Sequence, residues 1–496
     1  MNDTELSLVD AVAAQAAQAA PQFARTEYAV RRRLLESIAD AIDGAADQLV
    51  PLARAETNLP EARLRGEVAR TTYQLRAFAR LLLDGRQLGI AIEHSDPAFP
   101  LGGPSPDLRM MSLPVGPVAV FAASNFPFAF SVAGGDTASA LAAGCPVVVK
   151  AHPGHPSLSR ATADLIRGVL DDLALPTGIF GMIEGQEAGV RLVQHPAIRA
   201  AAFTGSTAGG RALFDIATRR PEPIPFYGEL GSINPVYVTR EAMGADADAI
   251  AAGFVDSYTT GAGQLCTKPG VVFVPARHRT FARTVLERLD SVQPARLLND
   301  AIAGAFERSG AYFDRTEGVT VLRRGGDTGD GFTPALFTTS LDAFLQSSES
   351  LTHERFGPSA LLVEYEDAER LASAAQVIGG TLTSTIHADA VDDAGLTGLL
   401  PVAAQMSGRL IWNSWPTGVT VSPAMMHGGP YPASTAPLHT SVGATAIARF
   451  LRPVAFQGFP DEALPAELRE SNPLGLARSV DSLRAEPGDG PRKAAE

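Results

Sequence analysis

The first part of the chain has a helical pattern of apolar residues. From about residue 29 to 84 they recur at steps of three and four, which is the spacing of one face of an amphipathic helix. The residues concerned are Val30, Leu34, Ile38, Ile42, Leu75, Phe78 and Leu81. We therefore expect a layer of helices at this end of the molecule.

Short apolar runs and helical segments alternate from residue 115 onward. The runs, which we interpret as buried strands, are 118–122, 147–150, 179–183 and 200–204. Segments 131–143 and 157–173, and another between the last two strands, have helical spacing, and in 157–173 six apolar residues share one face. This alternation predicts a parallel, doubly wound sheet and hence a nucleotide-binding α/β domain.

A second alternation follows residue 229. Strands are expected at 271–274, 360–364 and 410–412, and helices at 278–289 and 366–377. This indicates a second α/β domain. The segment 94–108 is rich in proline, glycine and serine, which favours a loop or an extended arm. The polar tail at 485–496 is expected to be frayed.

Composition narrows the class of protein. A chain of 496 residues with 45% hydrophobic residues is long enough for two or three domains, and its formal net charge of -13 argues against a nucleic-acid or anionic-membrane partner. The most apolar stretch, near 129–149, is interrupted by Gly134 and Asp136, so no membrane helix is expected. The acidic N-terminus is unlike a secretory signal. We expect a cytoplasmic protein.

The chain has two cysteines, Cys145 and Cys266, too few for a disulfide framework. Cys266 lies in the glycine-punctuated turn 261–267, between an expected helix and an expected strand, where backbone amides could stabilise a thiolate nucleophile. Inert burial is the alternative for an isolated cysteine. Cys145 precedes Pro146 and an apolar strand, so we expect it to be buried and structural.

Glu229 stands at the end of an expected strand, with Gly228 before it and Gly231 two residues after it. A carboxylate there can project into a cleft and act as a general base, provided that partial desolvation raises its pKa toward neutrality. A glutamate at a strand end can equally be an ordinary solvated side chain.

The segment 203–211 follows a strand and opens a helix, so its backbone amides could face a pyrophosphate. Gly205, Ser206 and Gly210 are the candidates, although the segment lacks a GxGxxG fingerprint and such turns also serve packing alone. Lys150, at the end of another strand, could reach a ribose or a phosphate, or be an ordinary solvated lysine.

Taken together, these segments resemble the aldehyde dehydrogenase superfamily from about residue 25 to 460. Six motifs occur in the order of the family: Ser124–Phe128 (SNFPF), Val148–Lys150 (VVK), Phe203–Thr207 (FTGST), Glu229–Gly231 (ELG), Gly263–Cys266 (GQLC) and Glu354–Pro358 (ERFGP). The resemblance implies a Rossmann-like cofactor domain, a second α/β catalytic domain and an oligomerisation arm. The corresponding ranges are 1–95 and 115–229, then 230–430, then 96–114 with 431–484.

The resemblance also assigns roles to residues. Cys266 attacks the aldehyde carbon, and the side-chain amide of Asn125 with the backbone amide of Cys266 stabilises the oxyanion. Glu229 activates the water that hydrolyses the thioester, so the product is a free acid rather than a CoA ester. Glu354 resembles the residue that holds the nicotinamide ribose, and Phe356 packs beside it. No metal is implied.

The resemblance implies a nicotinamide cofactor, and NADP is favoured over NAD. Many NAD-preferring members of the family have a glutamate three residues after the strand-end lysine, where this chain has Pro153. No carboxylate therefore repels a 2′-phosphate, and Lys150, His152 or the more distant Arg191 could attract one.

The C-terminal half resembles the branch of bacterial α-ketoglutaric semialdehyde (2,5-dioxopentanoate) dehydrogenases, which make 2-oxoglutarate. The segments that carry this likeness are 415–419, 426–433, 440–443 and 449–454, with 61–67, 70–72 and 74–76 near the N-terminus. An arginine near the substrate is expected for this anion, but no arginine is marked by its spacing.

Two alternatives to this small aldehyde substrate stay open. The first is an NADP-linked fatty aldehyde dehydrogenase, in which Phe126, Phe128 and Trp415 line an apolar channel instead of packing in cores or loops. The second is a catalytically silent binding protein of the same fold, which the presence of Cys266 and Glu229 disfavours. The family's arm at 96–114 implies a homodimer or homotetramer.

Overall fold

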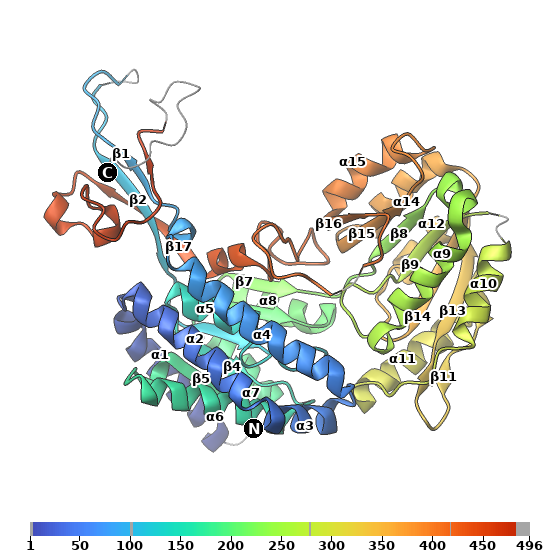
Figure 1. The fold of residues 1–496 in the computed structure, drawn as a ribbon, viewed down its shortest axis with the longest axis horizontal. Coiled ribbons are helices and arrows are strands. Elements are labelled where there is room, and N and C mark those ends of the chain that lie inside the picture. Colours follow the sequence, from blue (N-terminus) through green and yellow to red (C-terminus); the bar gives the residue numbers. More distant parts are fainter. Residues whose placement is uncertain (1–2, 100–102, 277–278, 417, 483–496) are drawn as a thin grey trace.

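The structure is a computed structural model that describes residues 3–99, 103–276, 279–416 and 418–482 (Figure 1). The predicted frayed tail at 485–496 lies outside these residues. Two helix-covered sheets and a small protruding sheet make up the molecule. Among the described residues, no helix combines the length and the apolar character that a membrane span requires.

The first sheet has five parallel strands in the order β5-β4-β3-β6-β7. Its strands confirm the four predicted ones to within about a residue at each end. Their bounds are β3 (Val118–Phe121), β4 (Val147–Lys150), β5 (Phe180–Ile183), β6 (Ala200–Thr204) and β7 (Phe226–Glu229). Valine and alanine dominate these strands because helices cover both faces of a parallel sheet.

Alternate residues of each strand enter two different cores. Val118 and Val147 face the layer of α2, α4, α5 and α6, whereas Ala119 and Val148 face α1, α7 and α8. The predicted helical layer is therefore confirmed. The helices are α1 (Asp3–Ala24), α2 (Tyr28–Gly44), α3 (Ala46–Thr57), α4 (Glu61–Leu81), α5 (Gly135–Ala143), α6 (Pro156–Asp172), α7 (Gln186–Gln194) and α8 (Thr207–Arg219).

The helix predicted at 131–143 begins only at Gly135. Residues 131–134 form a turn instead, in which the Gly134 amide bonds to the Ser131 carbonyl and the Gly135 amide to the Ala129 carbonyl. A Cβ at Gly134 would lie 2.6 Å from the Ala129 carbonyl oxygen, so only glycine fits this close backbone approach.

The second sheet has seven strands in the order β10-β13-β14-β9-β8-β15-β16, of which only β10 is antiparallel to its neighbour. The three predicted strands lie within β9, β14 and β16. The bounds are β8 (Pro235–Val238), β9 (Val271–Pro275), β10 (Thr320–Arg323), β13 (Ala335–Ser340), β14 (Ser359–Tyr365), β15 (Thr381–His387) and β16 (Ser407–Trp412); β11 (Gly326–Asp327) and β12 (Phe332–Thr333) form a separate hairpin.

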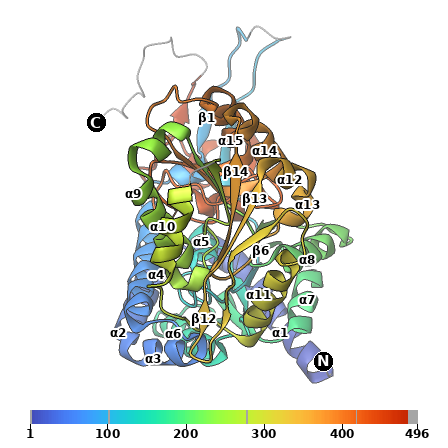
Figure 2. The ribbon, with the colours of Figure 1, turned by 90° about the vertical axis from the view of Figure 1, so that its right-hand side faces the viewer.

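Helices cover both faces of this second sheet (Figure 2). The two predicted helices correspond to α10 and, from Leu371 onward, to α14. Four strands of this sheet, β8, β10, β13 and β15, were not predicted. β15 shows why: its sequence is TLTSTIH, yet every residue is buried. The helices are α9 (Arg240–Thr259), α10 (Arg279–Leu289), α11 (Asp300–Phe313), α12 (Leu341–Gln346), α13 (Ser348–Leu351), α14 (Leu371–Ile378) and α15 (Leu396–Met406).

The third sheet joins distant parts of the chain in the order β17-β2-β1-β18 and projects from the body (Figure 1, upper left). It contains β1 (Ala91–Glu93), β2 (Leu108–Pro114), β17 (Leu451–Gln457) and β18 (Ser479–Val480). The loop predicted at 94–108 is the connection between β1 and β2. Before β17, the chain returns to the first sheet, where the Leu230 amide bonds to the Ala433 carbonyl.

Candidate active site

Several predicted site residues meet at one edge of the first sheet. Asn125 follows β3, Lys150 ends β4, Gly205 follows β6 and Glu229 ends β7. These strands are parallel, so their carboxyl ends lie at the same edge. The strand order changes direction between β3 and β6, and a crevice at such a point is the usual ligand site of an open α/β sheet.

Cys266 comes to this edge from the second domain, on a tightly wound loop before β9. Gly261, Ala262 and Gly263 all have positive φ, and a Cβ at Gly263 would collide with the backbone carbonyl of Gly357. The side-chain amide of Asn234 donates to the carbonyl oxygens of Cys266 at 2.7 Å and of Lys268 at 3.0 Å. The nucleophile candidate is thus held by packing and by hydrogen bonds on both sides.

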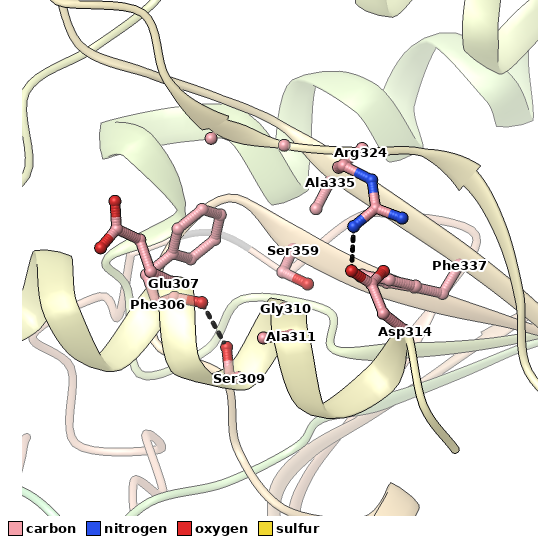
Figure 3. A pocket seen from close by; sticks show the side chains of 12 residues that line it. Phe306, Glu307, Ser309, Gly310, Ala311, Asp314, Arg324, Ala335, Phe337 and Ser359 are labelled. Carbon is pink, nitrogen blue, oxygen red and sulfur yellow. Dashed lines mark hydrogen bonds and ion pairs between the residues drawn. The ribbon is translucent and has the colours of Figure 1, made fainter.

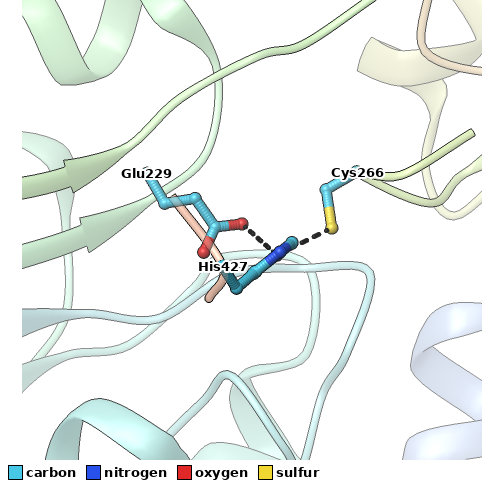
Figure 4. A group of neighbouring side chains, drawn as sticks. All are labelled: Glu229, Cys266 and His427. Atoms are coloured by element: carbon cyan, nitrogen blue, oxygen red, sulfur yellow. Dashed lines mark hydrogen bonds and ion pairs between the residues drawn. The ribbon is translucent and has the colours of Figure 1, made fainter. Parts of the chain in front are cut away.

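Cys266, Glu229 and His427 form one cluster (Figure 4). The Cys266 Sγ lies 3.4 Å from His427 Nε2, and Glu229 Oε1 lies 2.9 Å from the same nitrogen. The Ser441 hydroxyl donates to the other oxygen of Glu229. Cys266 and Glu229, which are 37 residues apart in the sequence, therefore contact one imidazole. The three ligand atoms lie within 4.8 Å of one another, a spacing that a bound metal ion could also bridge.

The protonation states of His427 and Glu229 are set by their charged neighbours more than by burial. Burial alone would lower the pKa of His427, but the neighbouring Glu229 and Cys266 raise it to about 10. Burial alone would raise the pKa of Glu229, but His427, the Ser441 hydroxyl and Arg449 together lower it below its ordinary value. An imidazolium and a carboxylate are therefore the stable forms at neutral pH.

The expectation for the surroundings of Glu229 was wrong. It placed the carboxylate in a cleft, with a pKa raised by partial desolvation, whereas the side chain is only 3% exposed and its pKa is lowered. The reason is the return of the C-terminal segment, which brings both His427 and Ser441 against the end of β7.

Asn125 lies beside the Cys266 loop. Its side-chain amide donates to the Gln264 carbonyl at 3.0 Å, two residues before the cysteine. That bond uses one of the two amide hydrogens. The backbone carbonyl of Asn125 in turn accepts a hydrogen bond from Arg63 at 2.7 Å.

Three arginines from different elements approach the same region. Arg63 and Arg70 lie on α4, with guanidinium carbons 5.1 and 5.9 Å from the centre of the Phe126 ring, and Arg409 lies on β16. Burial lowers the pKa of each, and the charge of Cys266 partly offsets this for Arg70 and Arg409.

The segment that follows α13 links the two domains. A Cβ at Gly231 would collide with the carboxylate of Glu354, so this side chain lies directly against the loop after Glu229. Burial raises the pKa of Glu354 to about 7, while the Lys268 ammonium lowers it. Phe356 packs against the core of the first domain. Both predicted cofactor residues thus lie where the domains meet.

The residues proposed to favour a 2′-phosphate differ in their surroundings. The Lys150 ammonium is half-buried at the end of β4, and Pro153 is exposed beyond it. Burial, with His155 and Lys150 nearby, lowers the pKa of His152 to about 3, so its ring is neutral at physiological pH. Arg191 forms two 2.8 Å bonds with Asp10 of α1, which already neutralise its charge.

The turn after β6 is the predicted strand-to-helix turn. The Ser206 hydroxyl caps α8 by accepting the Gly209 amide at 3.3 Å, so that amide is not free for a ligand. A Cβ at Gly210 would collide with Leu230, and one at Gly205 would lie 2.8 Å from the Phe203 ring. These glycines therefore let the turn lie closely on β6 and on the loop after Glu229.

The aromatic residues proposed for an apolar channel do not form one. Phe128 is 3% exposed in the core of the first domain, and Trp415 packs on Phe254 and His387 beside the second sheet. Only Phe126 lies at the site, between Arg63 and Arg70. The arrangement does not favour the apolar channel of the fatty-aldehyde alternative, because Phe128 and Trp415 pack in the cores of different domains.

A separate pocket of about 310 Å³ lies between α11 and the strands β13 and β14 (Figure 3). Among the residues that line this pocket, Arg324 and Asp314 form the only ion pair. None of its lining residues belongs to the cluster of Figure 4. The cluster of Cys266, Glu229 and His427, which contains the candidate nucleophile and a carboxylate, is therefore the candidate active site.

His427, Ser441, Arg70 and Arg409 are site residues that the sequence analysis did not identify as such. His427, Ser441 and Arg70 fall within motifs that carry the likeness to the semialdehyde branch, namely 426–433, 440–443 and 70–72, so those motifs were the available signal. Arg409 stands at the start of a strand with no motif around it, and no sequence signal marks it.

Comparison with known proteins agrees with this geometry. Residues 2–430 match the aldehyde dehydrogenase family. The chain is 47% identical over 462 residues to alpha-ketoglutaric semialdehyde dehydrogenase 2 of Azospirillum brasilense, a match that covers 91% of this chain and 87% of the relative. It is 40% identical to the alpha-ketoglutaric semialdehyde dehydrogenase of Acinetobacter baylyi, with 96% and 91% covered.

Solved structures share the fold. A 3,6-anhydro-L-galactose dehydrogenase in complex with NAP superposes with a TM-score of 0.77 at 22% identity, covering 91% of this chain and 92% of that one. An NAD-dependent aldehyde dehydrogenase from Sinorhizobium meliloti gives 0.76 at 24% identity, covering 92% and 88%. The arrangement of two α/β domains and a projecting sheet is thus the fold of these enzymes.

Proposed function

Because the chain belongs to the aldehyde dehydrogenase family and is an NAD(P)-dependent aldehyde dehydrogenase, we propose that it oxidises α-ketoglutaric semialdehyde to 2-oxoglutarate with NADP. The observation that carries the chemistry is the cluster of Cys266, His427 and Glu229, in which a thiol and a carboxylate contact one imidazole. The substrate is supported by the two relatives named for this semialdehyde.

In the first half of the reaction, the Cys266 thiolate attacks the aldehyde carbon and a C–S bond forms. The second hydrogen of the Asn125 amide and the backbone amide of Cys266 stabilise the oxyanion. When bound, the cofactor would supply a nicotinamide as the hydride acceptor, and Cys266 would then hold the substrate as a thioester. His427, 3.4 Å from the sulfur, orients the nucleophile.

In the second half, water attacks the thioester, Glu229 accepts the proton, and the C–S bond breaks to release the carboxylic acid and the thiolate. In the enzyme without substrate, the pKa of Glu229 is lowered, so this carboxylate is a weak base while His427 is protonated. Thioester formation removes the negative charge of Cys266, which is one of the charges that raise the pKa of His427. The imidazolium of the acylated enzyme is therefore easier to deprotonate, and a neutral His427 would no longer supply the charge that lowers the pKa of Glu229.

The residues present fit a nicotinamide dinucleotide at the crevice. The turn between β6 and α8 presents a helix N-terminus, Lys150 offers a half-buried ammonium from β4, and Glu354 offers a carboxylate beside the loop after Glu229. Preference for NADP is supported by Lys150 and by Pro153, which leaves no carboxylate against a 2′-phosphate; His152 and Arg191 contribute less because one is neutral and the other is paired.

We also propose a homodimer or homotetramer that assembles through the projecting sheet. Its edge strands β17 and β18 have unpaired outer sides within the described sheet, and Val480, Met110 and Phe459 expose large apolar side chains there. A thiol nucleophile needs a reducing compartment, which favours the cytoplasm.

The initial rate of NADP reduction tests the proposed substrate. The semialdehyde is compared with pentanal, a medium-chain fatty aldehyde and a short aldehyde, and each assay is repeated with NAD. We expect the highest kcat/KM for the semialdehyde with NADP. A higher kcat/KM for the fatty aldehyde would mean that the protein is a fatty aldehyde dehydrogenase instead. A higher kcat/KM with NAD would reverse the proposed cofactor preference.

Alkylation of Cys266 with and without NADP tests whether the protein is an enzyme of this mechanism. We expect the cofactor to change the rate at which Cys266 is alkylated, because the cofactor site adjoins the Cys266 loop. A catalytically silent protein would show no such dependence.

A further inference from the structure

Arg63, Arg70 and Arg409 place positive charge around the candidate nucleophile without carboxylate partners. Among the described residues, none of the three forms an ion pair, although Arg65 and Arg76, on the same helix as Arg63 and Arg70, each pair with two carboxylates. Buried nitrogens of all three also lack hydrogen-bond partners: Arg63 Nη1, Arg70 Nε and Nη2, and Arg409 Nε and Nη2.

The three guanidinium groups lie close to the Cys266 loop or to residues next to His427. A Cβ at Gly261 would lie 2.7 Å from Arg63 Nη1, so this group lies directly against the loop. Arg70 lies over the Phe130 ring at 5.3 Å, and that ring lies 6.5 Å from the ring of His427. Arg409 comes from β16 in the second domain, and its Nη1 lies 3.9 Å from the sulfur of Met425, two residues before His427.

Local acids do not satisfy these charges. The charge of Glu67 acts on both Arg63 and Arg70, but its Oε1 accepts the backbone amides of Phe128 at 2.8 Å and Ala129 at 3.0 Å. The charge of Glu229 also acts on Arg70, but that carboxylate is already paired with His427. Burial raises the pKa of Glu67 to about 7, so it is only partly ionised at neutral pH. The region therefore keeps an excess of positive charge, which is costly unless a ligand provides the anion.

We propose that Arg70 and Arg409 bind the carboxylate of the substrate, from α4 and β16 respectively, while its aldehyde group lies at Cys266. This inference rests on the proposed function and names the residues that would select an ω-aldehyde bearing an acid group. A guanidinium offers two parallel donors to a carboxylate. Arg63 holds the backbone of Asn125 and adds to the positive field.

The proposed carboxylate anchor also predicts that the site selects against fatty aldehydes, which the aromatic residues at the site do not predict. A fatty aldehyde would place an apolar chain against buried, unpaired guanidinium groups, and desolvating a charge without a partner is unfavourable. The site would reject such a chain even though Phe126 and Phe130 lie beside it.

Kinetics with two five-carbon aldehydes test this anchor. Arg70→Gln and Arg409→Gln are compared with the wild type on α-ketoglutaric semialdehyde and on pentanal, which has the same length and no carboxylate. Arg80→Gln is the matched control, because Arg80 is an exposed arginine on the same helix as Arg70. We expect each anchor variant to lose about 10- to 100-fold in kcat/KM for the semialdehyde, mainly through KM, with little change for pentanal.

Arg70→Lys separates the anchor from a general electrostatic effect on Cys266. Lysine keeps the charge but loses the planar pair of donors, so we expect an intermediate loss for the semialdehyde. Protection of Cys266 from iodoacetamide by 2-oxoglutarate gives a second readout, which should weaken in Arg70→Gln and Arg409→Gln but not in Arg80→Gln.

The outcomes distinguish the anchor from the proposed function. If the wild type prefers the semialdehyde and both anchor variants keep that preference, the anchor is wrong and the substrate stands. If the variants lose activity equally on both aldehydes, the arginines act on Cys266 or on folding rather than on the carboxylate. If the wild type itself shows no preference for the carboxylated aldehyde, both proposals are overturned.

Discussion

The two cysteines lie in similar positions between a helix and a strand, but their surroundings differ. Each follows a helix and a glycine-containing turn and precedes a buried strand, β4 for Cys145 and β9 for Cys266. Cys145 is fully buried in the core of the first domain, where its thiol donates to the Phe450 carbonyl at 3.4 Å. Cys266 is half-buried and lies 3.4 Å from an imidazole that also contacts a carboxylate.

The difference shows that partners brought by distant segments decide what a cysteine does. Burial raises the pKa of Cys145 to about 11, so it stays a neutral thiol. The partners of Cys266 come from β7 and from the segment after β16, which meet it only in the folded chain. One cysteine is thus a small apolar core residue, whereas the surroundings of the other suit the nucleophile that we propose.

Replacing the nucleophile should have the largest effect. Cys266→Ala removes the atom that forms the covalent bond, so we expect kcat to fall by at least about 10⁴-fold while the cofactor still binds. Steady-state NADP reduction measures the first and fluorescence titration with NADPH the second. Turnover close to that of the wild type would contradict the role of Cys266.

Replacing the base should have the next largest effect and should affect only one half of the reaction. In Glu229→Gln we expect a burst of reduced cofactor, followed by steady turnover about 10²- to 10⁴-fold slower, because the amide cannot accept a proton from water. Stopped-flow absorbance resolves the two phases. Absence of a burst would mean that Glu229 acts before the thioester forms.

Removing the imidazole should lower turnover less and change the pH dependence of stability. His427→Gln loses one charged contact, so we expect about a 10- to 100-fold loss in kcat/KM. The pKa of His427 rises from 6.5 to about 10 on folding, so its contribution to the free energy of unfolding is complete below pH 6.5 and is lost as the pH rises through 10.

Thermal melts of the wild type and of His427→Gln at several pH values test that sign. The difference in Tm should be large near pH 6 and shrink toward pH 10. His353→Gln, which alters an exposed histidine, is the control and should show no such trend. A difference that grows with pH would mean that His427 is neutral in the folded protein.

Replacing the structural cysteine should have the smallest effect and completes the comparison. Cys145→Ala leaves a small gap in the first core, so we expect about 1 kcal/mol of lost stability with unchanged kcat and KM. Urea denaturation and the standard assay measure these. Loss of activity in a folded Cys145→Ala protein would mean that the two cysteines do not differ as described.

Local pattern predicted strands that are buried on both faces and helices that have one apolar face. Four of the five strands of the first sheet and helices α2, α4 and α6 follow from the spacing of their apolar residues alone. The pattern failed for β15, where buried threonine and serine occupy a central strand, and for residues 131–134, where backbone contacts replace the first helical turn. In both, hydrogen bonds rather than apolar burial decide the conformation.

The order of the motifs likewise predicted the family. Through that resemblance it also predicted that Cys266 and Glu229 belong to one site. It did not predict that Glu229 is buried with a lowered pKa or that Arg191 is neutralised by Asp10. Each of these depends on a contact between residues far apart in the chain.

The sequence by itself determined the class of fold and marked the candidate nucleophile and the candidate cofactor region, because strand and helix periodicity and glycine-bearing turns are local properties. Only the tertiary structure decided the charge of the site. His427, Arg70 and Arg409 lie on three separate segments, and only folding brings them together around Cys266. Electrostatic interactions depend on distance in space and on burial, and neither quantity is written in the order of the residues.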